Sequence, residues 1–118
     1  MAWEQIRHFF GRSREDIEAQ DEAHEALRAG TTPIGQAQPR SRVEVYGILR
    51  AVTYSPQGAN PRLIGQLYDG TGSIDLVWMG RRNVAGIEPG RHVRASGMVL
   101  SGYTRPTIFN PNYELMPA

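Results

Sequence analysis

Two glycines inside regular strand patterns constrain the fold of this chain more than any other feature. From residue 42 onward, apolar and polar residues alternate with period two, which is typical of strands that bury one face. Gly47 and Gly97 each interrupt a long run of this kind. Glycine weakens a strand unless the strand bends sharply or bulges at that position. Because the closing of a small barrel requires bent strands, the pattern predicts a barrel.

The alternation predicts five strands, which turn signals separate. The expected strands cover residues 42–54, 62–68, 73–79, 91–100 and 107–115. The sequence Asp69-Gly70-Thr71-Gly72 predicts a tight hairpin between the second and third strands, because glycine accepts a positive φ. Residues 80–90 break the alternation and are long enough for a short helix. This order of elements, with the first and fourth strands bent, is that of a five-stranded Greek-key barrel, the OB-fold.

The first 41 residues have a different composition and divide into two parts. Residues 1–29 lack a strand pattern, and Ser13 is a suitable N-cap for a helix from about residue 15 to 28. Residues 30–41 contain two prolines and two glycines and are expected to form a linker. The predicted protein is therefore all-β, with an N-terminal helical extension, a linker, and an OB-fold barrel over residues 42–115.

Charge is divided unevenly along the chain. Residues 1–39 hold four arginines and seven acidic residues, a net charge of −3, whereas residues 40–118 hold nine arginines and five acidic residues, a net charge of +4. An acidic extension on a basic body suggests a polyanionic partner for the body.

Three stretches of the barrel region resemble a known family. They are Val43-x-Val45-x-Gly47-x-Leu49, Leu63-x-Gly65-x-Leu67-x-Asp69-Gly70-Thr71-Gly72-x-Ile74-x-Leu76, and Glu88-Pro89-Gly90-x-x-Val93-x-Ala95-x-Gly97-x-Val99. The pattern is similar to OB-fold nucleic-acid-binding domains, in particular the wedge domain of branch-migration DNA helicases and the anticodon-binding domains of aminoacyl-tRNA synthetases. The ending Asn110-Pro111-Asn112-Tyr113-Glu114-Leu115 resembles the helicase wedge, and the whole looks like small stand-alone actinobacterial OB-fold proteins. The resemblance covers residues 42–115 and implies a nucleic-acid-binding barrel without the helicase motor or the synthetase catalytic domain.

The sequence lacks the signatures of catalysis, metal binding and membrane insertion. It has no cysteine and no lysine, which excludes thiolate metal sites, a cysteine nucleophile and a lysine-containing phosphate loop. The histidines at positions 8, 24 and 92 do not have the spacing of metal ligands. The longest apolar run, residues 76–79, is too short to span a bilayer, and the N-terminus does not resemble a signal peptide. We therefore expect a cytoplasmic protein that is not an enzyme, needs no cofactor and does not contact membranes.

The alternation also predicts which side chains face outward, where OB-folds bind their ligands. Aromatic rings and arginines are interleaved on this face. The combination suits single-stranded nucleic acid, because rings stack on bases and guanidinium groups bind phosphates. The candidate contacts are Tyr46 and Arg50 on the first strand, Arg62, Gln66 and Tyr68 on the second, Arg94 on the fourth, and Tyr103 and Arg105 in the loop that follows it.

The same pattern allows a second interpretation. Exposed tyrosines on antiparallel strands also serve cross-strand packing. Apolar side chains that would suit a protein contact are Ile64, Val77 and Met79 on this face and Trp3, Ile6, Phe9 and Phe10 in the extension. The sequence thus favours binding of single-stranded DNA or RNA, with a protein-interaction or oligomerisation module as the alternative.

Overall fold

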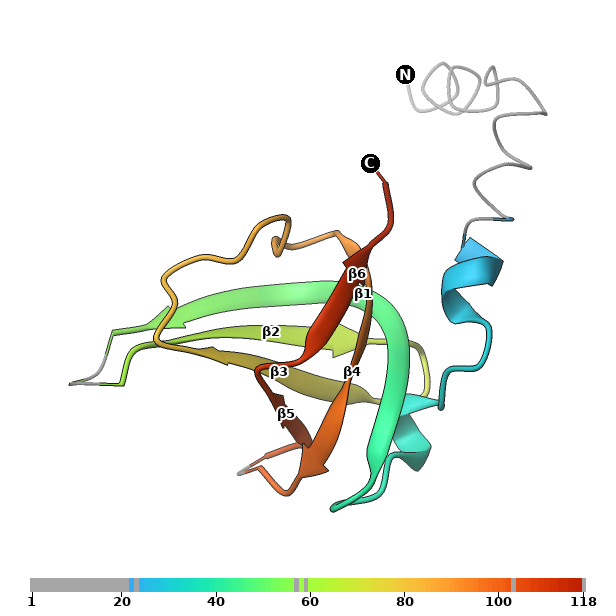
Figure 1. Cartoon of the computed structure of the whole chain (residues 1–118), viewed down its shortest axis with the longest axis horizontal. Helices are drawn as coiled ribbons and strands as arrows, with labels where there is room; N and C mark the ends of the chain where they lie inside the picture. The colour runs from blue at the N-terminus through green and yellow to red at the C-terminus, as the bar shows by residue number, and fades with distance from the viewer. Residues whose placement is uncertain (1–21, 23, 57, 59, 103, 118) are drawn as a thin grey trace, which may run out of the picture.

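Five strands close into a barrel, and a sixth strand is added outside the ring (Figure 1). The computed structural model describes residues 22, 24–56, 58, 60–102 and 104–117. The strands are β1 (Arg42–Ser55), β2 (Arg62–Tyr68), β3 (Ser73–Met79), β4 (His92–Leu100), β5 (Thr107–Phe109) and β6 (Asn112–Leu115). Antiparallel pairs β4–β1, β1–β2, β2–β3 and β5–β4, together with the parallel pair β3–β5, complete the ring. The expected all-β barrel is therefore present, and β6 pairs with β4 beside it.

The strand bounds follow the alternation closely except at the C-terminal end. The strands β2 and β3 have the predicted bounds, and β1 and β4 differ from them by one residue. The predicted fifth strand is broken into β5 and β6 at Asn110 and Pro111. Asn110 has a positive φ of 49°, and a proline has no N–H for a strand ladder, so pairing stops there. Residues 80–90, which are long enough for a short helix, form turns and bends instead.

The strand β1 bends around the barrel and changes partner halfway (Figure 1). Its first half, from Arg42 to Ile48, pairs with β4, and its second half, from Ile48 to Ser55, pairs with β2. The register to β2 shifts between Leu49 and Ala51, which makes Arg50 the extra residue of a bulge. At Gly47, an added Cβ would lie 2.8 Å from the carbonyl carbon of Tyr68 and would overlap the carbonyl oxygen. The strand β1 is bent, as predicted, and the close approach of β2 explains why glycine is needed at position 47.

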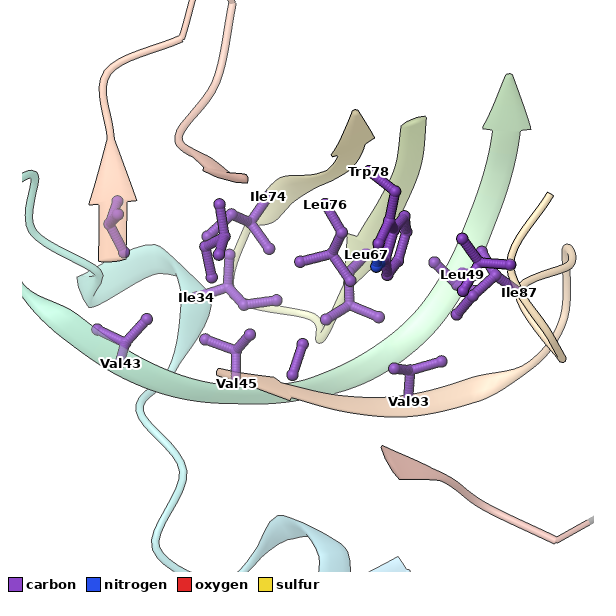
Figure 2. Packing of buried hydrophobic residues seen from close by; sticks show 14 of the residues in the cluster. Ile34, Val43, Val45, Leu49, Leu67, Ile74, Leu76, Trp78, Ile87 and Val93 are labelled. Carbon is purple, nitrogen blue, oxygen red and sulfur yellow. The ribbon is translucent and has the colours of Figure 1, made fainter. Parts of the chain in front are cut away.

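The barrel interior is filled by inward-facing aliphatic side chains (Figure 2). The largest fully buried side chains are Leu49, Leu67, Ile74, Leu76, Ile108, Val45, Val93 and Val99. Trp78 on β3 is 5% exposed, as the alternation predicted. Ile87, from the loop between β3 and β4, packs beside Leu49 at one end of the cluster, whereas Ile34 lies near Val45 toward the other (Figure 2).

The segment expected to be a linker is held against the barrel. Its short 3₁₀ helix η1 (Ile34–Gln36) places Ile34 in the core with 2% of its surface exposed. Backbone N–H groups of this segment donate to fixed partners on the barrel: Thr32 to the Glu44 carbonyl at 2.7 Å, Ile34 to Asp69 Oδ2 at 2.9 Å, and Arg40 to the Val99 carbonyl at 2.7 Å. Proline and glycine here permit tight packing rather than mobility. The segment is thus attached to the barrel by Ile34 and by these hydrogen bonds.

Helical residues precede this segment. Residue 22 and residues 24–28 are helical, and the rest of the helix predicted from residue 15 lies outside the described residues. In the described part of the chain, we find no helix with the length and apolar character needed to cross a bilayer.

Candidate functional site

A groove lies on the outer surface of β2, β3 and β5 and is walled by the loop between β4 and β5. Its volume is about 500 Å³, and we call it the β2–β3 groove; its lining residues are Arg62, Ile64, Asp75, Val77, Ser101, Gly102, Thr104, Thr107 and Phe109. Ile64 is the cross-strand partner of Val77, and Val77 is in turn the parallel partner of Phe109. Outward side chains of adjacent partners lie side by side, so these three form an apolar floor across three strands.

Among the described residues that line this groove, Phe109 is the aromatic one, and the interpretation of the sequence missed it. The ring is 42% exposed, whereas the preceding Ile108 is completely buried. Alternation within the short β5 explains this outward position. The signal was present in the sequence, because alternation over residues 107–109 places Phe109 outward, but Phe109 was not among the predicted contacts.

Two arginines and one carboxylate give the groove its charge. Arg105 Nη1 lies 3.5 Å from Asp75 Oδ1, and this ion pair joins the β4–β5 loop to β3. Burial raises the pKa of Asp75, and the nearby Arg105 opposes that rise. Arg62 is half-buried at the start of β2, and no acidic side chain among the described residues lies within ion-pair distance of it.

Three more of the predicted contact residues, Arg50 of β1 and Gln66 and Tyr68 of β2, lie on the same outer face as the groove. Arg62, Gln66 and Tyr68 alternate with buried residues along β2, so all three point outward as predicted. Gln66 is the cross-strand partner of both Ala51 and Asp75. The Arg50 guanidinium lies 3.5 Å from the centroid of the Tyr68 ring, which is a close cation–π contact. The bulge on β1 is what brings Arg50 over β2.

A second hollow, of about 540 Å³, lies beside Tyr68 at the other end of β2. We call it the helix-side hollow; its lining residues are Arg28, Thr31, Pro33, Tyr46, Gly47, Ile48, Tyr68, Asp69, Gly70, Thr71 and His92. The sequence predicted Tyr46 as an exposed stacking ring, but only 3% of its surface is exposed. The ring does point away from the core, yet the helical residues preceding η1 cover it. His24 Nδ1 and the Tyr46 hydroxyl form a hydrogen bond, and the Arg28 guanidinium lies 5.3 Å from the ring centroid.

Arg94 is also engaged within the chain. Its Nη1 donates to the carbonyls of Leu27 at 3.1 Å and Ala29 at 3.0 Å, and its Nη2 forms an ion pair with Glu44. A cation that binds the last carbonyls of a helix caps that helix and complements its dipole. The structure therefore gives Arg94 a role in docking the helical residues to β1 and β4. Tyr103, the remaining predicted contact, lies outside the described residues.

Two histidines pack edge to face where the helical residues meet the barrel. The ring centroids of His24 and His92 are 4.6 Å apart, and Tyr46 stacks against His92 at 6.0 Å. Burial, followed by the positive charges of His24 and Arg28, lowers the pKa of His92. Burial also raises the pKa of Tyr46, which Arg28 partly counteracts. The described residues contain no group of three or more potential ligands that could hold a metal ion.

The hairpin between β2 and β3 is fixed by Asp69. Its Oδ1 accepts hydrogen bonds from the Thr71 N–H at 2.8 Å and the Gly72 N–H at 3.2 Å, and its Oδ2 accepts one from the Ile34 N–H at 2.9 Å. Burial by itself would raise the pKa of Asp69, but these bonds and one from the Thr71 hydroxyl outweigh it, so the pKa is lowered. Asp69 is thus a structural residue that also anchors η1.

Comparison with known proteins identifies the fold. No protein-family model and no curated protein sequence matches the chain. The fold is similar to the solution NMR structure of a replication factor A related protein from Methanobacterium thermoautotrophicum, with 12% sequence identity and a TM-score of 0.59. The similarity covers 75% of this chain and 92% of that one. Together with the ring of five strands, it shows that this chain is an OB-like β-barrel; the closer resemblance to helicase wedges and anticodon-binding domains remains a prediction.

Proposed function

We propose that this protein binds single-stranded DNA or RNA along the outer face of β2, without catalysis. The observation that carries the proposal is the β2–β3 groove, in which the exposed ring of Phe109 adjoins an apolar floor and Arg62 and Arg105 lie at its margins. An apolar floor with an exposed aromatic ring can stack bases, and arginines can bind the phosphates between them. The structurally similar protein is described as related to a replication factor, which is consistent with this function.

The geometry suggests how a strand would lie. The outward side chains of β2 run from Arg62, at the β2–β3 groove, to Tyr68, at the helix-side hollow. A base could stack on Phe109 at one end, and another could stack on the flat Arg50 guanidinium or the Tyr68 ring at the other. Such stacking needs unpaired bases, so single strands should bind better than a duplex.

A fluorescence anisotropy titration tests the proposal. Labelled single-stranded DNA, single-stranded RNA and duplex DNA would be compared over a series of salt concentrations. If Arg50, Arg62 and Arg105 each neutralise one phosphate, the slope of log K against log salt for single strands should be about −2. Binding of the duplex as tight as that of single strands, or no binding of any strand at low salt, would contradict the proposal.

A second candidate function is a protein contact. Among the described residues, the exposed large apolar side chains are Met98, Leu100 and Phe109, all on β4 and β5. Such neighbouring apolar side chains can also mark a protein interface. Concentration-dependent elution in gel filtration, without any nucleic-acid binding, would favour this candidate.

A further inference from the structure

We propose that the β2–β3 groove selects guanine over thymine or uracil, and that Asp75 is the residue that makes this selection. The inference rests on the proposed function and adds base specificity to it. The observation behind it is that Asp75, an acidic residue, lines a groove whose arginine and apolar side chains otherwise suit a polyanion.

The position of Asp75 is unusual for an acidic residue. It lies within β3, between its strand partners Gln66 of β2 and Thr107 of β5, and its side chain is only 23% exposed. A carboxylate here repels the phosphates of a bound strand. A base edge, rather than the sugar-phosphate backbone, should therefore face Asp75 when a strand occupies the groove.

The chemistry of a carboxylate decides which base edge fits. An ionised carboxylate only accepts hydrogen bonds, and its two oxygens can take two parallel donors. Guanine presents such a pair, N1–H and the N2 amino group, on its Watson–Crick edge. Thymine and uracil instead present one N–H between two carbonyl oxygens, which a carboxylate repels. Single-stranded recognition leaves this edge free for reading.

The neighbours of Asp75 orient the carboxylate but leave most of its hydrogen-bond acceptor positions free. Arg105 approaches Oδ1 at the long distance of 3.5 Å, and a carboxylate has about four acceptor positions. The backbone N–H of Asp75 donates to the Pro106 carbonyl at 2.9 Å, so the strand is fixed beside the loop. Partial burial strengthens any hydrogen bond that Asp75 makes to a base, because less water competes.

Asp75 has a second possible role, which is to hold the β4–β5 loop through Arg105. Loss of that role would weaken binding of all strands alike, whereas loss of base reading would weaken binding of guanine-containing strands alone. The experiment below separates the two.

The first part of the experiment changes only the ligand. Full-length protein would be titrated with three single strands of equal length: oligo(dT), alternating thymidine and deoxyguanosine, and alternating thymidine and deoxyinosine. We expect the guanine-containing strand to bind at least about fivefold tighter than oligo(dT), the lower limit for a bidentate contact to a base edge. Inosine lacks the N2 amino group and should lose most of this gain. Equal binding of the three strands would overturn the inference but not the proposed function; no binding of any strand would overturn both.

The second part changes the protein. Asp75→Asn should abolish the preference for guanine while affinity for oligo(dT) stays the same or rises, because the negative charge that repels phosphates in the groove is removed. Glu88→Gln is the matched control, since it removes the same charge from an exposed position in the loop between β3 and β4. The control should keep the preference. An equal loss of affinity for all strands in Asp75→Asn, or a preserved preference for guanine, would overturn the inference.

Discussion

At the scale of single residues, Phe109 and Tyr68 are the rings on which the proposed binding depends. Phe109→Ala and Tyr68→Ala should each weaken single-strand binding by about 1–3 kcal/mol, the usual contribution of one base–aromatic stack. Both rings point outward, so the barrel should remain folded. Met98→Ala is a suitable control, because Met98 is 40% exposed but does not line the groove. Unchanged affinity with a large drop in melting temperature would show that the rings are structural.

Gly47 and Gly97 offer a test of why the strands bend. In Gly47→Ala, the new Cβ meets the backbone of Tyr68, which cannot move without disturbing β2. In Gly97→Ala, it lies 2.6 Å from Cγ2 of Ile108, the end of a side chain. We expect both to lose about 1–3 kcal/mol of unfolding free energy, with the larger loss at Gly47. Urea denaturation measures this, and a larger loss at Gly97 would mean that the close approach of β2 is not the limiting contact.

The sequence located the outward residues of β2 well, because alternation determines which face of a sheet a side chain occupies. It could not reveal what covers that face. Tyr46 has the alternation of an exposed residue, and its burial depends on His24 and Arg28, more than fifteen positions away. Arg94 could not be assigned correctly for the same reason, since its partners are carbonyls of the helical residues.

At the scale of elements, the strands were predictable and their interruptions were not. The turn at Asn110 requires a positive φ that asparagine tolerates but does not enforce, so the alternation alone did not show the break between β5 and β6. Pro111 was the visible signal, because a proline cannot donate a hydrogen bond to a strand ladder. Ile34 was overlooked because a single apolar residue among turn formers has no period. Its packing depends on hydrogen bonds to the β2–β3 hairpin.

The segment containing η1 should therefore contribute to the stability of the barrel. A protein that begins at residue 31 should fold and keep the contribution of Ile34, losing only the contacts of the helical residues with the barrel. A protein that begins at residue 42 should still fold but be less stable, because it lacks Ile34. In the full chain, Ile34→Ala should lose about 2–5 kcal/mol, as is usual for a buried aliphatic side chain. Thermal unfolding followed by circular dichroism would test this, and equal stability of the two truncated proteins would contradict it.

The contact between the helical residues and the barrel should depend on pH. The pKa of His92 is lowered in the folded state, so its contribution to stability is present above the unfolded pKa of about 6.5 and is lost as the pH falls through the folded value. The melting temperature should therefore decrease on acidification from about pH 7.5 to about pH 5.5. His92→Gln, which cannot titrate, should show a smaller decrease. An identical decrease in both proteins would exclude His92 as the cause.

At the scale of the whole molecule, the two hollows lie at opposite ends of β2 and differ in the segments that line them. The described residues that precede β1 line the helix-side hollow but contribute no residue to the lining of the β2–β3 groove. The net charge of +4 on residues 40–118 is modest, so nonspecific attraction of a polyanion is weak and binding must depend on local contacts.

The location of the bound strand is the central claim, and an NMR titration of the isotope-labelled full chain with single-stranded oligonucleotide tests it most directly. The proposed function predicts that amide shift changes concentrate on β2, β3, β5 and the loop from Ser101 to Pro106. Residues of β6 should change little, because that strand lies outside the ring on β4. Shift changes concentrated on β6 and on the helical residues 24–28 would contradict the proposed function. The absence of shift changes at a saturating concentration of oligonucleotide would also contradict it.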